Sequence, residues 1–171
     1  FSSDKKSEDV KRGLYERYDN GLPSGKAFIG YLNDKTKEKG GRDWYVDEKQ
    51  FWKVQAILKR FLKGRDSIRS ITRFADHELH LRTPKRKREG GKPLSQSYIY
   101  RVLTSPIPAG FFYATDEHGV RRSYVLDAKL PRMISEEEHF SIKRMLGERA
   151  TPKTQKHDTL YAWMMKGSDG G

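Results

Sequence analysis

Apolar residues recur every three or four positions in five stretches of the chain, a pattern that predicts amphipathic helices. The first helix is expected from Ser3 to Tyr18, with Gly21 placed where a helix ends. The second is expected from Asp47, which can cap its N-terminus, to Gly64. The residues expected to face inward from these two helices are Val10, Leu14, Tyr15, Tyr18, Phe51, Val54, Leu58 and Phe61.

Two shorter helices are predicted on either side of a basic loop. One begins at Asp66 or Ser67 and runs to about Leu79, and the other is capped by Ser95 or Ser97. Each begins with a short polar residue that can cap the helix and continues with an apolar stripe, which is the pattern of a capped surface helix. The residues expected to face inward are Ile68, Ile71, Ala75, Ile99, Val102 and Leu103.

A β-hairpin and a last helix complete the predicted elements. Alternating apolar residues in FFYATDEHGVRRSYVL predict a hairpin that turns between Asp116 and Gly119. Ser135 and Glu138 have the spacing of a capping box, which predicts a helix over residues 135–150. Proline and glycine make residues 22–30 extended, and the lysine-rich residues 33–43 are expected to form a loop or hairpin tip. We therefore expect a mainly α, α+β fold with a small β-hairpin.

The charge balance narrows the class of partner. The 35 Lys and Arg residues exceed the 23 Asp and Glu residues, giving a formal net charge of +12. Such an excess favours a polyanionic partner through its long-range field, although an incidental basic surface has the same composition. Only 35% of the residues are hydrophobic and 34% are charged, which is lean for a compact globule.

Several classes of site are excluded or disfavoured by what the sequence contains. There is no cysteine, so disulfides and cysteine-built zinc sites are excluded, and the composition is compatible with a reducing cytoplasm. No apolar run approaches the roughly 20 residues of a membrane-spanning helix. We expect a cytoplasmic protein with no membrane partner, no metal and no cofactor.

The segment GLPSGKAFIGY, residues 21–31, superficially resembles a nucleotide phosphate loop. That loop needs two glycines flanking four residues, followed by Lys and a hydroxyl that holds magnesium. Asn20 stands where the first glycine belongs, and Ala27 stands where the hydroxyl belongs. Two of the four working parts are missing, so nucleotide binding is disfavoured and the segment needs another explanation.

The segment ADHELH offers acidic and imidazole side chains for a metal or a hydrolase. His77 and His80 are three residues apart, whereas the zinc-peptidase signature requires histidines four apart. A metal-dependent nuclease or hydrolase using Asp76, His77 and His80 is therefore a weaker hypothesis than an ordinary helix end or a solvated loop.

A basic loop joins the two short helices. Its cations are Lys85, Arg86, Lys87, Arg88 and Lys92. A charge run of this kind is often only solvated. Here it precedes a capped helix whose polar face carries Gln96, Ser97, Tyr100 and Arg101, residue types that suit the major groove of DNA: Gln reads adenine, Arg reads guanine, and Ser or Tyr holds phosphate. The two helices and the loop between them are therefore interpreted either as a helix-turn-helix with an enlarged turn or as a plain helical hairpin.

The order of these motifs resembles the recombinase domain of large serine recombinases, the phage integrase and transposon resolvase type. The resemblance runs from Gly21 to about Arg149 through GLPSGKAFIGY, FLKG, SIRSIT, GGKPLSQSYIYRVLTSPIPAGFF and PRMISEEEHFSIKRML. Gly-Lys-Pro-Leu-Ser at residues 91–95 is similar to the family's Gly-Lys-Pro-Trp-Ser. Leu94 in place of Trp and Ser105 in place of Asn are departures.

The resemblance implies duplex DNA binding, with the slim linker residues Ser24, Gly25 and Lys26 in the minor groove. The alternative for this linker is a rigid spacer that touches nothing. The major-groove residues are then Gln96, Ser97, Tyr100 and Arg101, and the phosphate contacts are Arg69, Arg73, Lys85, Arg86, Lys87, Arg88 and Lys92. A non-catalytic DNA- or RNA-binding regulator is the alternative function.

The resemblance also implies a domain division. Residues 1–22 would be the end of a long helix from a catalytic domain that this chain lacks, and residues 23–150 the DNA-binding domain. Residues 151–171 would lead toward a zinc ribbon, although KGSDGG has no cysteine where the first pair would fall. The partners implied are a double-stranded DNA attachment site and other recombinase subunits, in a bacterial or phage setting. No serine of this chain is expected to be catalytic.

Overall fold

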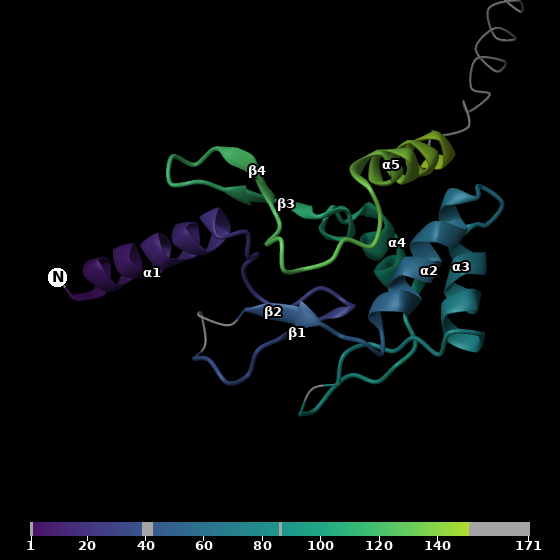
Figure 1. Ribbon diagram of the computed structural model, residues 1–171, viewed down its shortest axis with the longest axis horizontal. Helices are drawn as coiled ribbons and strands as arrows, with labels where there is room; N and C mark the ends of the chain where they lie inside the picture. The colour runs from purple at the N-terminus through teal and green to yellow at the C-terminus, as the bar shows by residue number, and fades with distance from the viewer. Residues whose placement is uncertain (1, 39–42, 86, 151–171) are drawn as a thin grey trace, which may run out of the picture.

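The computed structural model describes residues 2–38, 43–85 and 87–150 (Figure 1). The helices are α1 (Ser2–Asp19), α2 (Phe51–Leu62), α3 (Ile68–His77), α4 (Gln96–Thr104) and α5 (Glu136–Ala150), with a 3-10 turn η1 (Ile107–Ala109). The strands are β1 (Tyr31–Asn33), β2 (Trp44–Val46), β3 (Phe111–Thr115) and β4 (Arg121–Val125). Strands β1 and β2 pair antiparallel, as do β3 and β4. The predicted α+β class is confirmed.

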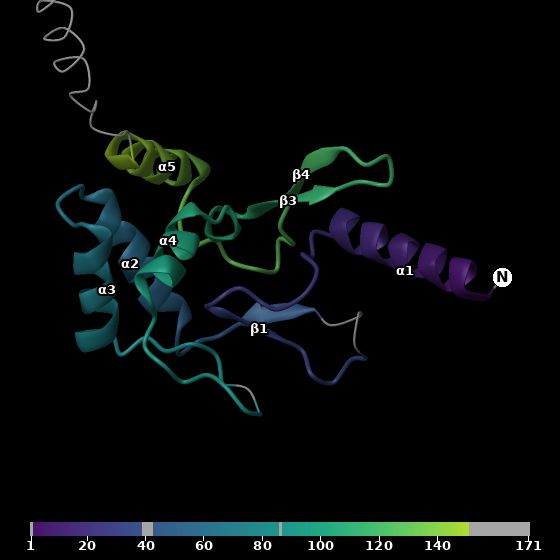
Figure 2. The same ribbon diagram turned by 180° about the vertical axis from the view of Figure 1, so that it is seen from behind.

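Helices α2 to α5 form the body of the molecule, and the two hairpins lie between this body and α1 (Figures 1 and 2). The first hairpin brackets the lysine-rich segment, in agreement with its prediction as a hairpin tip, although residues 39–42 lie outside the described part. The second turns through Asp116 to Gly119, as predicted. Among the described residues, no helix combines the length and apolarity needed to cross a bilayer.

The core lies where the helices α2 to α5 meet. The fully buried residues include Val54, Ile57, Leu58 and Phe61 of α2, Ile71 and Ala75 of α3, Ile99, Val102 and Leu103 of α4, and Ile142 of α5. Burying one such aliphatic or aromatic side chain contributes about 1.5–3 kcal/mol. The inward faces predicted for α3 and α4 from their spacing are confirmed.

Two details of the predicted helices are wrong. Helix α2 begins at Phe51 and not at Asp47, because Asp47 accepts a hydrogen bond from the backbone of Lys49 at 3.1 Å and stabilises a turn before the helix. Val10 was expected to face inward and is 72% exposed. Only the last turns of α1 reach the second hairpin, so the apolar stripe of α1 is covered at Tyr18 and not at Val10.

The predicted caps of α3, α4 and α5 are present. Ser67 accepts a hydrogen bond from the backbone of Ser70 at 3.1 Å and starts α3. Ser95, and not Ser97, caps α4 by accepting from the backbone of Tyr98 at 3.2 Å. In the capping box before α5 the backbone of Ser135 donates to the Glu138 carboxylate at 2.9 Å, and the backbone of Glu138 donates to the Ser135 hydroxyl at 3.2 Å. Local sequence therefore determines where these helices begin.

Gly21 joins α1 to the second hairpin. Its φ of 75° is left-handed, and the backbone of Leu22 donates to the Arg17 carbonyl at 3.0 Å, which closes the helix in a Schellman motif. The Gly21 carbonyl accepts from the backbone of Asp127 at 2.9 Å. A Cβ on Gly21 would lie 2.6 Å from the Asp127 nitrogen and 2.7 Å from the Val125 oxygen. The joint therefore requires glycine for its backbone conformation and for its close packing.

The substitution Gly21→Ala is expected to destabilise the fold through both effects. The left-handed backbone costs about 1–2 kcal/mol with a Cβ, and the overpacking adds about 1–3 kcal/mol. Gly119→Ala is the matched control, because Gly119 has a φ of 77° but nothing within 4 Å of an added Cβ. Urea unfolding should show the larger loss for Gly21→Ala, and equal losses would mean that the contact with β4 does not matter.

His139 is buried in an aromatic cluster at the start of α5. Its ring is 1% exposed and lies 5.4 Å from the rings of Phe111 and Phe140, measured between centroids. Its Nδ1 has no hydrogen-bond partner among the described residues. Burial lowers the pKa of His139 below its ordinary value of 6.5, and the charge of Lys143 lowers it further. The fold therefore favours the neutral form of this imidazole.

This lowered pKa predicts a loss of stability in mild acid. The unfolded chain takes up the proton near its ordinary pKa while the folded chain does not, so the free energy of unfolding falls as the pH drops below about 6.5 and is constant above about 7. Urea unfolding between pH 7.5 and 5.5 should show the fall in the unchanged chain and in His77→Gln, whose histidine is exposed. The fall should be absent in His139→Leu, and a fall of the same size there would assign it to other groups.

Candidate nucleic-acid interface

The basic loop between α3 and α4 is pinned at its base. The backbone of Thr83 donates to the Lys92 carbonyl at 2.9 Å, and the backbone of Gly91 donates to the Thr83 carbonyl at 2.8 Å. The Thr83 hydroxyl also accepts from the backbone of Lys92 at 3.1 Å. Gly90 has a φ of 112°, and a Cβ there would lie 2.1 Å from the Pro84 oxygen, so the chain turns back at a glycine. The ends of the loop are therefore held while its cations project.

The described cations of this loop are all exposed: Lys85, Lys87, Arg88 and Lys92. Arg86, the remaining predicted phosphate contact of the loop, lies outside the described residues. Lys92 lies beside the N-terminus of α4, where it lines a depression together with Ser95 and Tyr98. The structure thus brings one end of the loop to the start of the helix predicted to read bases.

Helix α4 presents its predicted polar face to solvent. Gln96, Ser97 and Arg101 are exposed, and Tyr100 is 46% exposed. The opposite face is buried against α3 and α5. The Arg101 guanidinium lies 5.3 Å from the centre of the Tyr98 ring, which orients it along the helix. The four predicted major-groove residues therefore share one accessible surface on a helix that the core holds in place.

Arg69 and Arg73 are exposed on α3, on the side away from the buried Ile71 and Ala75. They are four residues apart, so they are neighbours on the helix. Within the described residues no hydrogen bond or salt bridge joins them to the basic loop or to the polar face of α4. Their role as phosphate contacts stays a prediction.

The linker after α1 leaves the helix in a fixed direction. The Tyr18 hydroxyl donates to the Ser24 hydroxyl at 3.1 Å, and the Arg17 side chain donates to the Pro23 carbonyl at 3.1 Å. Gly25 has a φ of 87° with nothing within 4 Å of an added Cβ, so only its backbone conformation requires glycine in the free protein. Ser24, Gly25 and Lys26 are all exposed, which leaves the predicted minor-groove segment accessible.

Lys26 and Lys85, distant in sequence, line one groove with the first hairpin. We call it the hairpin groove; its lining is Lys26, Ala27, Tyr31, Leu32, Asn33, Asp34, Lys35, Thr36, Asp43, Trp44, Tyr45, Pro84 and Lys85. No binding role was predicted from the sequence for Lys35 or for the hairpin strands. One sequence feature could have indicated the hairpin: the aromatic and β-branched residues Trp44–Val46 follow a lysine-rich segment that contains glycine. This is the pattern of a strand that follows a hairpin tip.

The acidic and imidazole segment after α3 does not form a catalytic group. Asp76 pairs with Arg82 at 2.6 Å. His77, Glu78 and His80 are exposed, and Glu78 lies 3.8 Å from Arg60. Among the described residues, no three His, Asp or Glu side chains are grouped so as to hold a metal ion. The geometry gives the hydrolase hypothesis no support.

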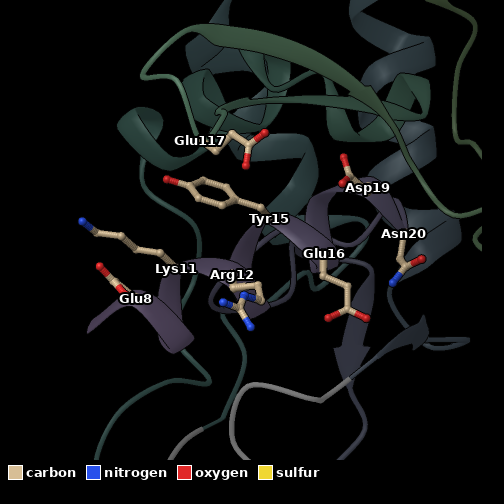
Figure 3. A pocket seen from close by; sticks show the side chains of 8 residues that line it. All are labelled: Glu8, Lys11, Arg12, Tyr15, Glu16, Asp19, Asn20 and Glu117. Atoms are coloured by element: carbon tan, nitrogen blue, oxygen red, sulfur yellow. The ribbon is translucent and has the colours of Figure 1, made fainter. Parts of the chain in front are cut away.

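A second depression lies between α1 and the turn of the second hairpin (Figure 3). Its lining residues are Glu8, Lys11, Arg12, Tyr15, Glu16, Asp19, Asn20 and Glu117. Figure 3 shows these side chains spread along the helix and pointing in different directions, with Glu117 contributed by the hairpin turn. Charges of both signs are mixed there, so this surface lacks the single sign that a polyanion requires.

The fold is shared with solved structures of DNA-recombination proteins. One is a crystal structure of a large serine recombinase–DNA complex, with a TM-score of 0.57 and 17% identity over 85% of this chain. Another comes from work on the sequence requirements of the Listeria innocua prophage attP site, with a TM-score of 0.55 and 19% identity over 81% of this chain. The resemblance predicted from the motifs is confirmed at the level of the fold.

The chain spans 41% and 51% of the lengths of these two chains. No family model matches the sequence, and no curated protein is significantly similar to it. The likeness therefore lies in the three-dimensional arrangement and shows the fold alone.

Proposed function

We propose that the chain recognises a specific duplex DNA site as the site-recognition part of a site-specific serine recombinase. The observation that carries this proposal is the exposed face of α4, which presents Gln96, Ser97, Tyr100 and Arg101 together. The helix is capped at its start, and its opposite face is buried in the core. The pinned basic loop ends at the N-terminus of this helix. The likeness to chains from recombinase–DNA work supports the same conclusion.

The proposed contacts divide into reading and positioning. Gln96 and Arg101 have the geometry for bidentate hydrogen bonds to adenine and guanine in the major groove. Ser97 and Tyr100 contact bases or phosphates from the same helix. Phosphates are held by the loop cations and by Arg69 and Arg73, and the linker residues Ser24, Gly25 and Lys26 follow the adjacent minor groove.

The proposal extends to the role of the remaining segments. Helix α1 would join the DNA-binding residues 23–150 to a catalytic domain that forms the serine–DNA ester, and residues 151–171 would lead toward a zinc ribbon. Strand exchange would require other recombinase subunits bound at the partner site. Within such an assembly this chain chooses the site and holds the catalytic domain over it.

Selection of duplexes from a random DNA pool by the 171-residue chain tests this function. The selection is made at about 150 mM salt, where non-specific phosphate contacts are weakened. We expect enrichment of one extended, non-palindromic half-site with an A·T-rich portion beside a specific core. A flat pool would contradict sequence-specific binding, and preferential competition by structured RNA would favour the regulator alternative.

Arg101→Ala and Lys87→Ala separate reading from positioning. Arg101→Ala should cost about 1–3 kcal/mol of binding free energy on the selected site and relax the preference at one base pair. Lys87→Ala should weaken binding to all DNA sequences alike and make the slope of log affinity against log salt shallower by about one unit. Titrations of the selected duplex and a scrambled duplex at several salt concentrations check both. If both variants lose the same affinity on the selected and on the scrambled duplex, Arg101 does not read a base.

A further inference from the structure

The hairpin groove brings together lysines from three separate segments of the chain. Lys26 comes from the linker after α1, Lys35 from the first hairpin and Lys85 from the basic loop. All three are exposed, and within the described residues none takes part in a salt bridge. We propose that this groove holds one sugar–phosphate strand of the bound duplex, with Lys35 as a phosphate contact. This inference rests on the proposed DNA-binding function and adds the first hairpin to the interface.

The two carboxylates that line the groove are engaged by neighbouring residues. Asp34 accepts hydrogen bonds from the backbone of Thr36 at 2.9 Å and from its hydroxyl at 2.6 Å. Asp43 pairs with Lys37 across the hairpin. Lys37 offsets the charge of Asp43, and the three lysines outnumber the remaining carboxylate, that of Asp34, so the field in the groove is positive. A polyanion is the class of ligand that such a field attracts.

The floor of the groove is aromatic and polar. Trp44 is 6% exposed, and its indole nitrogen has no hydrogen-bond partner among the described residues; the Asn33 side-chain oxygen also has none. The Tyr31 hydroxyl donates to the Pro131 carbonyl at 2.7 Å and holds that ring in place. The Asn33 oxygen and the Trp44 nitrogen are themselves buried, so a ligand in the groove would meet the exposed lysines and not these atoms.

The groove is continuous with the surface proposed to bind DNA. Pro84 lines the hairpin groove and also the depression beside the N-terminus of α4. The same short loop therefore carries Lys85 at the groove and Lys92 at the recognition helix. A DNA sugar–phosphate strand that passes the start of α4 can follow the basic loop into the groove and remain next to lysine side chains along the way. This continuity favours a duplex DNA strand over a separate acidic protein as the occupant.

The test is the salt dependence of binding to the selected duplex by Lys35→Ala. One lost phosphate contact should make the slope of log affinity against log salt shallower by about 0.9, with a severalfold loss of affinity that is the same on scrambled duplex. Lys143→Ala is the matched control, because Lys143 is an exposed lysine on α5, which lies at the opposite end of the molecule from the basic loop in both views (Figures 1 and 2). Its slope should equal that of the unchanged chain. Lys35→Arg should also keep the slope.

Duplexes with a single methylphosphonate locate the contact. Neutralising the phosphate held by Lys35 should weaken DNA binding by the unchanged chain and should have no further effect on DNA binding by Lys35→Ala. If the unchanged chain binds its site and Lys35→Ala keeps the full slope, the groove does not bind the backbone and the proposed function stands. Equal reductions in Lys35→Ala and Lys143→Ala would assign the effect to overall charge and overturn the inference. Absence of duplex binding by the unchanged chain would overturn both proposals.

Discussion

Ile99, Val102 and Leu103 fix α4 against α3 and α5, and the four proposed major-groove contacts all lie on that helix. One helix face can present side chains to a groove only when the opposite face is held by a core. The α4 sequence meets both requirements, since its apolar residues lie on one side and its amide, hydroxyl and guanidinium groups on the other. The cap at Ser95 then determines where the recognition face begins.

The remaining parts of the surface are positioned by backbone constraints at glycines. Gly90 and the paired Thr83 and Lys92 hold the base of the basic loop next to the start of α4. Gly21 docks the end of α1 on the second hairpin and so sets the direction in which the linker leaves. The exposed cations are thus carried on a backbone that is anchored at its base, which lowers the entropy that binding would cost.

Local signals predicted much of this fold. Periodicity identified the inward faces of α3 and α4, and capping sequences identified their first residues, because both depend on neighbours within one or two turns. The exposure of Val10 depends on what lies next to α1 in space, which spacing along the chain does not contain. The same limit hid the hairpin groove, whose lysines at positions 26, 35 and 85 meet only through tertiary contacts. The start at Phe51 instead follows from the local turn at Asp47, which the capping pattern alone does not distinguish from a first helical turn. The polar face of α4 was predictable because it lies on a single helix.

In the proposed complex α4 lies in the major groove while the linker follows the adjacent minor groove. The chain has no cysteine, so Ser97→Cys and Ser24→Cys each give a single attachment point for an iron chelate that cleaves nearby DNA. On the selected duplex the account predicts two separate cleavage patterns, with centres about half a helical turn, or about 5 base pairs, apart. Cleavage of the same base pairs from both positions, or cleavage spread evenly along the duplex, would contradict it.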